Sequence, residues 1–170
     1  MTQERVRGML SGYMRNKARK GHLEAEIKKM DREYQRTRSE LVDTLAGPRA
    51  QVITDMPHGT GISDPTAQLA VKLAGGWEND ELKEMRREIQ RKQGCLEDIR
   101  TELEYVDAWV EGLPARERFV IEHQMLRQEY WREVEDGYRE RFGYEVSRDT
   151  LKRTKMQALT LIYQIADATV

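Results

Sequence analysis

The chain has 170 residues, a length that suits one medium domain or two small ones. Its 30 acidic and 29 basic side chains nearly cancel, and 35% of all residues are charged. This balance disfavours a disordered polyelectrolyte, because such a chain needs a large net charge to stay open. Mixed charge with sparse, regularly spaced apolar residues instead indicates long solvated helices with narrow apolar stripes.

The distribution of apolar residues and cysteine indicates the compartment. No stretch has the apolar core of a signal peptide or the length of a membrane span, so we expect no membrane contact. Cys95 is the only cysteine, which excludes an internal disulfide and favours a reducing environment. We therefore expect a cytoplasmic protein.

The first 20 residues are basic, with six Arg or Lys side chains against one Glu. These cations are Arg5, Arg7, Arg15, Lys17, Arg19 and Lys20. Two interpretations are open: a segment that follows a phosphate backbone, and the solvated start of a helix. Apolar residues at positions 6, 9, 10 and 13 favour a helix here, whereas glycines at 8, 12 and 21 disfavour it.

Residues 23–45 and 82–110 each have apolar residues at steps that mostly alternate between three and four. The first stripe is Leu23, Ile27, Met30, Tyr34, Thr37, Leu41 and Leu45. The second stripe is Leu82, Met85, Ile89, Leu96, Ile99, Leu103, Val106 and Val110. Long helices with one narrow stripe each are unstable alone in water. We expect them to pair as an antiparallel, coiled-coil-like hairpin, or with copies of the chain.

Glycine and proline mark the limits of these helices. Gly47–Pro48 is expected to end the first, and Gly112–Pro114 the second. Residues 47–65 hold three prolines and three glycines, which predicts a linker or an irregular loop. A short helix is expected to begin at Pro65. Residues 1–112 are accordingly assigned to a helical hairpin and oligomerisation region.

Residues 113–170 predict a separate unit of three helices, at roughly 115–127, 130–142 and 148–166. Gly143 is expected to end the middle helix, and Ser147 to cap the last one. The inner side of that last helix consists of Leu151, Thr154, Ala158, Ile162 and Ile165. A helical wheel turns Asp149, Lys152, Arg153 and Met156 outward, with Arg148 and Lys155 on the flanks.

A capped helix with outward cations is typical of a helix-turn-helix, whose second helix reads DNA. The same pattern occurs in three-helix bundles whose exposed charges only keep them soluble. The pattern favours the two interpretations about equally. The fold class that we expect is therefore all-α, with a long N-terminal hairpin and a C-terminal three-helix unit.

Two stretches of sequence resemble known families. LPARERFVI and GYEVSRDTLKR look like region four of sigma factors. PHGTGISDPTAQLAVKL is similar to the Gly-rich, Asp-Pro-Thr segment of the ArpU/RinA-type phage late-transcription regulators, which join a helical hairpin to a sigma-like helix-turn-helix. The small residue that the middle helix of such motifs usually carries is displaced, with Gly137 close to its expected position.

The resemblance implies that Ser147 caps a reading helix and that Arg148, Lys152 and Arg153 face DNA. Arg116 and Arg118 are implied candidates for contacts to the DNA backbone. The full set of candidate DNA-binding residues is Arg148, Asp149, Lys152, Arg153, Lys155, Arg116 and Arg118. Long cationic side chains reach phosphates, and guanidinium groups also pair with guanine edges.

We expect a sequence-specific transcription regulator of phage type that binds double-stranded DNA in the host cytoplasm. Self-association is expected, and RNA polymerase is a further candidate partner. One alternative is a small terminase subunit that binds a packaging site. Another is a helical adaptor or scaffold that never touches DNA.

We expect neither an enzyme nor a cofactor. The three histidines, His22, His58 and His123, are far apart in sequence and lack the spacing of metal ligands. Neither a P-loop nor a dinucleotide-binding glycine motif occurs. Cys95 lies within a predicted helix without an identifiable base, which disfavours a nucleophile.

Overall fold

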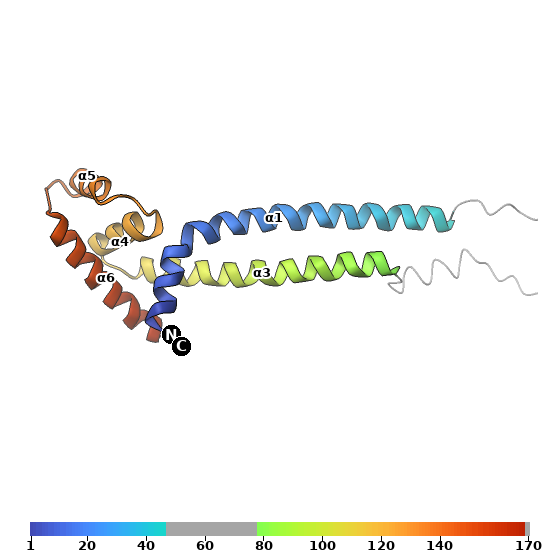
Figure 1. Ribbon diagram of the computed structural model, residues 1–170, viewed down its shortest axis with the longest axis horizontal. Helices are drawn as coiled ribbons and strands as arrows, with labels where there is room; N and C mark the ends of the chain where they lie inside the picture. Colours follow the sequence, from blue (N-terminus) through green and yellow to red (C-terminus); the bar gives the residue numbers. More distant parts are fainter. Residues whose placement is uncertain (47–77, 169–170) are drawn as a thin grey trace, which may run out of the picture. The chain divides into compact units, whose positions relative to one another are not determined.

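A computed structural model describes residues 1–46 and 78–168 of the chain (Figure 1). Every regular element in these residues is helical, which confirms the predicted all-α class. The elements are α1 (Gln3–Ala46), α3 (Asp80–Glu111), α4 (Ala115–Ile121), a π-helical turn (Glu122–Leu126), α5 (Trp131–Phe142) and α6 (Arg148–Ala168). The predicted linker at 47–65, the helix expected from Pro65 and the Asp-Pro-Thr segment lie outside the described residues.

The helix bounds follow the local sequence closely. α3 ends at Glu111, directly before Gly112–Pro114. Gly143 follows α5 with a φ of 78°, a left-handed conformation that glycine adopts without steric cost, and its N–H donates to Arg139 O at 2.8 Å. α1 runs without interruption from Gln3, so the glycines at 8, 12 and 21 do not break it.

Two compact units divide the chain: Met1–His22 with Cys95–Val170, and Leu23–Gly94. This division differs from the predicted boundary between residues 112 and 113. The reason is that the start of α1 and the last turns of α3 share a core with the helices that follow. Each unit is described separately below.

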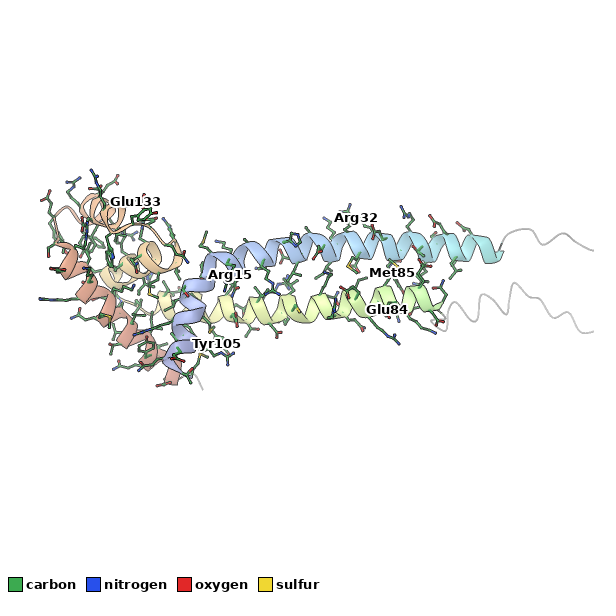
Figure 2. The ribbon with its side chains drawn as sticks, viewed as in Figure 1. Arg15, Arg32, Glu84, Met85, Tyr105 and Glu133 are labelled. Carbon is green, nitrogen blue, oxygen red and sulfur yellow. The ribbon has the colours of Figure 1, made fainter. Side chains whose placement is uncertain are left out.

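In the unit Leu23–Gly94, α1 and α3 run antiparallel. Lys92 Nζ lies 3.1 Å from Glu26 Oε2, and Arg86 Nη2 donates to Tyr34 Oη at 3.0 Å, so positions further along α1 meet earlier positions of α3. Tyr34 Oη also donates to the buried carboxylate of Glu78. Both predicted stripes are turned inward, with buried side chains at Leu23, Ile27, Tyr34, Leu82 and Ile89. Arg32 lies on the outer side of α1, whereas Met85 lies on the side of α3 that faces α1 (Figure 2).

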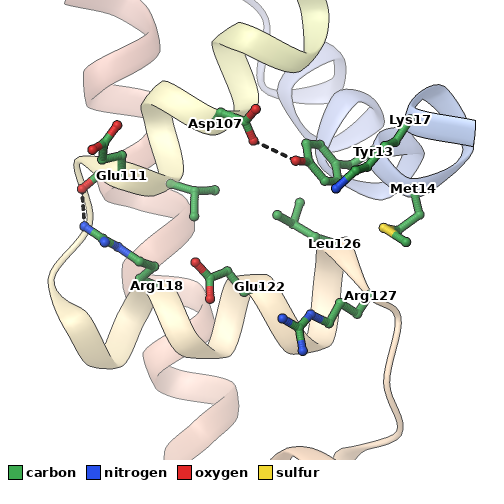
Figure 3. Close-up of a pocket in the computed structure, with 10 residues that line it drawn as sticks. Tyr13, Met14, Lys17, Asp107, Glu111, Arg118, Glu122, Leu126 and Arg127 are labelled. Atoms are coloured by element: carbon green, nitrogen blue, oxygen red, sulfur yellow. Dashed lines mark hydrogen bonds between the residues drawn. The ribbon is translucent and has the colours of Figure 1, made fainter. Parts of the chain in front are cut away.

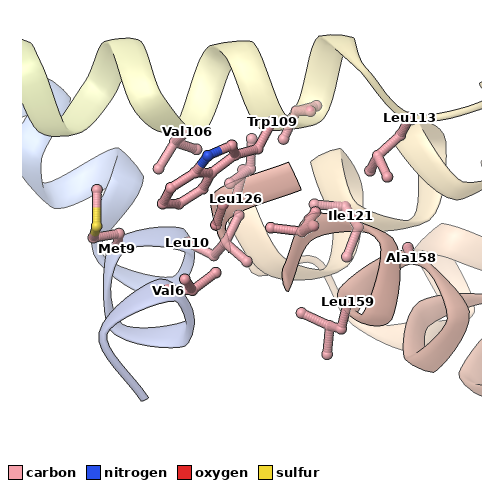
Figure 4. Packing of buried hydrophobic residues seen from close by; sticks show 13 residues of the cluster. Val6, Met9, Leu10, Val106, Trp109, Leu113, Ile121, Leu126, Ala158 and Leu159 are labelled. Atoms are coloured by element: carbon pink, nitrogen blue, oxygen red, sulfur yellow. The ribbon is translucent and has the colours of Figure 1, made fainter. Parts of the chain in front are cut away.

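The other unit has a core to which both ends of the sequence contribute (Figure 4). Its buried members are Val6, Met9 and Leu10 of α1; Val106, Trp109 and Val110 of α3; Leu113, Ile121 and Leu126; and Ala158, Leu159, Ile162 and Ala166 of α6. Trp109 is 1% exposed and Leu10 is fully buried. Each fully buried large side chain contributes about 1.5–3 kcal/mol of transfer free energy. α6 is therefore anchored along most of its length.

A second apolar cluster packs α5 and the first turn of α6 against α4. Phe119 and Val120 of α4, Val134 and Tyr138 of α5, and Leu151 of α6 form its buried part. The ring of Phe119 meets those of Tyr138 and Phe142 edge-on, with both centroid distances at 5.7 Å. Ideal geometry places a Cβ on Gly137 only 3.2 Å from Phe119 Cζ, so the absence of a side chain lets α5 approach α4 closely. Gly137 therefore lies at the close contact between α4 and α5.

None of the helices in residues 1–46 and 78–168 is long and apolar enough to cross a membrane.

Candidate nucleic-acid interface

The start of α6 is fixed by a serine cap. Ser147 Oγ accepts a hydrogen bond from the Thr150 N–H at 3.3 Å, and Ser147 O accepts one from the Leu151 N–H at 3.1 Å. The Ser147 and Thr150 hydroxyls are a further 2.9 Å apart. These bonds satisfy backbone groups that a helix start leaves without intrahelical partners. Ser147 has the predicted capping geometry.

The two sides of α6 differ sharply in exposure. Leu151, Ala158 and Ile162 are at most 1% exposed, as the predicted inner side requires. On the opposite side Lys152 and Arg153 are both exposed. Because the inner side is anchored, the outward cations project from a helix that is held in place.

Three of the outward charges differ in their partners. Arg148 Nε lies 2.8 Å from Glu135 Oε1 of α5, and this hydrogen bond raises the pKa of Arg148 above its ordinary value. Lys152 Nζ lies 3.6 Å from Asp149 Oδ1, one turn earlier on α6. Among the described residues, no hydrogen bond or ion pair holds the side chain of Arg153. Of these cations Arg153 is the least constrained.

Lys155 has a different environment from the rest of the set. Its ammonium group lies 6.0 Å from the centre of the Trp131 ring, within reach of a cation–π interaction. Burial lowers the pKa of Lys155, and the nearby charge of Arg7 lowers it further. Lys155 is therefore at the edge of the exposed surface, as its predicted position on the flank requires.

The two arginines of α4 have separate roles. Arg116 is exposed, with its guanidinium 5.4 Å from the centre of the Tyr144 ring. Arg118 is turned back toward the end of α3, where its Nη2 donates to Glu111 O (Figure 3) and also to Leu113 O. These carbonyls have no helical partner at the end of α3, so Arg118 acts as a cap on that helix. Arg116 keeps the geometry of a candidate for DNA contact, and Arg118 is occupied within the protein.

Two contacts at this surface involve residues that were not among the candidates. Glu135, the partner of Arg148, is thirteen positions earlier in the chain, and no short spacing links the two. Arg7 of α1 donates from Nε to Tyr163 Oη of α6 at 2.6 Å. The basic composition of the first 20 residues singled out Arg7, but not its position against α6.

Other polar residues gather around a cavity in the unit Met1–His22 with Cys95–Val170. This cavity of about 460 Å³ is lined by three cations and three carboxylates, among them Lys17, Arg118, Asp107 and Glu122 (Figure 3). Tyr13 Oη donates to Asp107 Oδ1 at its edge, so the phenol is already engaged. In the described part of the chain no three His, Cys, Asp or Glu residues are grouped to hold a metal.

His123 and Cys95 have different environments. His123 Nδ1 lies 2.7 Å from Glu129 Oε2, and its ring stacks on Phe119 with a centroid distance of 4.0 Å. This makes His123 part of the packing around the π-helical turn. Cys95 is exposed on α3.

Comparison of the chain with models of protein families, with curated proteins and with solved structures finds no match.

Proposed function

We propose that the chain binds double-stranded DNA with the first turns of α6 and serves as a transcription regulator of phage type. One observation carries the proposal: Lys152 and Arg153 project into solvent from a helix whose opposite side is buried. The resemblance of LPARERFVI and GYEVSRDTLKR to sigma factor region four supports the same function.

The charge along the start of α6 supports DNA as the partner. Between positions 148 and 155 four basic residues outnumber the single Asp149. The lysines and arginines at these positions reach phosphates, and arginine also forms bidentate hydrogen bonds with guanine O6 and N7. Asp149 supplies an acceptor for the amino group of cytosine. The set therefore offers both backbone contacts and base contacts.

The exposed charges of α5 indicate how DNA approaches. Glu133, Asp136 and Glu140 are balanced on this helix by the equally exposed Arg132, Arg139 and Arg141, so α5 has no excess of exposed cations, in contrast to the start of α6. The approach that we propose brings the Ser147 end of α6 toward the DNA and keeps the outer side of α5 away from it. Arg116, beside Tyr144, is then a flanking backbone contact.

A single reading helix makes few contacts, so useful affinity needs two or more copies on one site. Self-association is part of the proposal, through a surface other than the stripes of α1 and α3, because the hairpin itself buries these stripes. Contact with RNA polymerase follows from the resemblance to late-transcription regulators and belongs to the proposal in the same way.

The test is DNA binding by the full chain, measured on duplexes that it selects from a random pool. Each neutralised phosphate adds about −0.9 to the slope of log affinity against log salt. Replacing both Lys152 and Arg153 with Glu should abolish binding and leave the helical circular dichroism unchanged. If this double variant binds DNA as tightly as the parent, α6 is not the reading helix.

A matched control separates local contacts from total charge. Lys28→Glu with Arg32→Glu makes the same charge change on an exposed side of α1, one helical turn apart, and should leave most of the affinity intact. The selected site then identifies the role. A site near a promoter supports regulation, whereas a site at a packaging sequence indicates a terminase subunit.

A further inference from the structure

A cavity of about 370 Å³ lies between the start of α1 and the middle of α6, within the unit Met1–His22 with Cys95–Val170. Met125, Met156 and Leu159 provide its apolar lining, and Arg7 and Lys155 are its charged residues. No carboxylate lines it. This distinguishes it from the cavity beside Tyr13, where three acids balance three cations.

Arg7 is held in place beside this groove. Its Nε donates to Tyr163 Oη at 2.6 Å, which leaves both Nη groups of the guanidinium for another acceptor. Within residues 1–46 and 78–168 neither Arg7 nor Lys155 has an ion pair with a carboxylate. Two cations therefore share one groove without a compensating negative charge, an arrangement that favours an anion.

The lowered pKa of Lys155 agrees with this geometry. Burial is its largest cause and the charge of Arg7 the second, so the two cations repel each other across the groove. An anion between them relieves that repulsion and raises the pKa of Lys155 again.

The groove continues a line of cations along α6. Arg148, Lys152 and Lys155 are spaced by four and three positions, so they lie on one side of the helix. Arg7 of α1 extends this line beyond Lys155. A row of cations from the capped start of α6 toward α1 suits one strand of a polyanion.

We propose that the groove between α1 and α6 binds a backbone phosphate of DNA through Arg7 and Lys155. This inference rests on the proposed function, since the DNA is the duplex that α6 reads. It gives the basic start of the chain a role as a backbone clamp. Because phosphate is the same in every sequence, the clamp adds affinity without discriminating between bases.

The test compares Arg7→Gln, Lys155→Gln and the parent on a selected duplex and on a duplex of random sequence, from 50 to 200 mM salt. Because the two cations share one phosphate, each variant should make the salt slope shallower by up to about 0.9. Over this fourfold salt range, each variant's affinity should therefore fall by a factor up to about 3.5-fold smaller than that of the parent. The loss of affinity should be similar on both duplexes.

Two control variants isolate the groove. Arg5→Gln removes an exposed cation two positions away, which helical geometry places on the opposite side of α1, and should leave the salt slope unchanged. Tyr163→Phe removes the hydrogen bond to Arg7 but keeps the charge, so it should change the slope much less than Arg7→Gln.

The outcomes separate the two proposals. In one outcome the parent binds DNA and Lys152→Glu with Arg153→Glu abolishes this binding. If Arg7→Gln and Lys155→Gln then retain the salt slope of the parent, the proposed clamp is wrong, whereas the proposal that α6 is the reading helix remains. If the parent shows no salt-dependent DNA binding, the proposed function fails and the clamp fails with it. If Arg5→Gln makes the salt slope as shallow as Arg7→Gln does, the proposed clamp is also wrong, because the total charge of the protein then explains the change in slope.

Discussion

Arg148 at the start of α6 is tied to Glu135 of α5, with Arg148 Nε 2.8 Å from Glu135 Oε1. This ion pair joins the two helices on either side of the turn that holds Gly143 and Ser147. In the proposed complex it competes with DNA for the guanidinium of Arg148. The pair therefore offers a way to change DNA binding without altering any proposed contact residue.

Glu135→Gln should strengthen DNA binding. The substitution frees Arg148 and removes a negative charge near the approaching phosphates, so the salt slope should become steeper by up to about 0.9. Thermal stability should change little, because both side chains of the pair are partly exposed to solvent, where ion pairs stabilise proteins only slightly. Weaker binding by this variant would indicate that the ion pair instead holds α6 in its binding orientation.

Arg116 and Arg118 should separate into a binding and a structural role. Arg118→Gln removes a charged donor from the carbonyls of Glu111 and Leu113 and should lower the free energy of unfolding by about 1–3 kcal/mol. Arg116→Gln should leave unfolding nearly unchanged and make the salt slope of DNA binding shallower. Urea unfolding and salt titration measure the two effects, and an exchange of the two phenotypes would contradict the assignment.

Gly137→Ala should destabilise the protein although alanine favours helices. The new Cβ meets Phe119 Cζ at 3.2 Å, and Phe119 is hemmed in by His123, Tyr138 and Phe142. Crowding should outweigh the gain in helix propensity, for a net loss of about 1 kcal/mol in the free energy of unfolding.

Gly21→Ala is the matched control for that crowding. Apart from its chain neighbours and the nearby backbone of its own helix, no atom lies within 4 Å of its added Cβ, so it should raise the free energy of unfolding by about 0.5–1 kcal/mol. If both glycine variants are equally stabilising, Phe119 yields to the methyl group and the close approach of α5 to α4 imposes no constraint.

Stability should fall as the pH rises from 10 to 12. Burial raises the pKa of Tyr13 and of Tyr138 from 10.0 to about 12, and hydrogen bonds to Asp107 and Tyr144 add to the respective shifts. Between these pH values the phenols ionise in the unfolded chain but stay protonated in the folded one. The unfolded state is therefore stabilised relative to the folded state. Urea unfolding at stepwise higher pH should show the loss, and Tyr13→Phe should flatten it. A profile with the same steepness in this variant would exclude Tyr13 as a cause.

The spacing of apolar residues was sufficient to predict most helices and their inner sides. It identified Leu23, Ile27 and Tyr34 in α1 and Leu151, Ala158 and Ile162 in α6, all of which are buried. Helix ends were predictable because glycine and proline act through their own backbone geometry. These are local effects, and each depends on a few neighbouring residues.

The partners of individual side chains were not predictable in this way. Arg116 and Arg118 are two positions apart and chemically identical, yet only the fold turns Arg118 toward Glu111. The apolar residues at Val6 and Leu10 favoured a helix but did not indicate that Trp109 and Ile162 would cover them. Contacts between distant parts of a chain depend on packing, which periodicity alone does not specify.

The core around Leu10 and Ile162 has a consequence for biosynthesis. The amino-terminal turns of α1 leave the ribosome before their partners in α6 have been translated. Val6, Met9 and Leu10 therefore remain uncovered by α6 in the nascent polypeptide until that helix has been made. Because the contact joins distant parts of the chain, its formation costs loop-closure entropy. Until it forms, the apolar side of α1 is exposed and prone to aggregation, and chaperones can protect it.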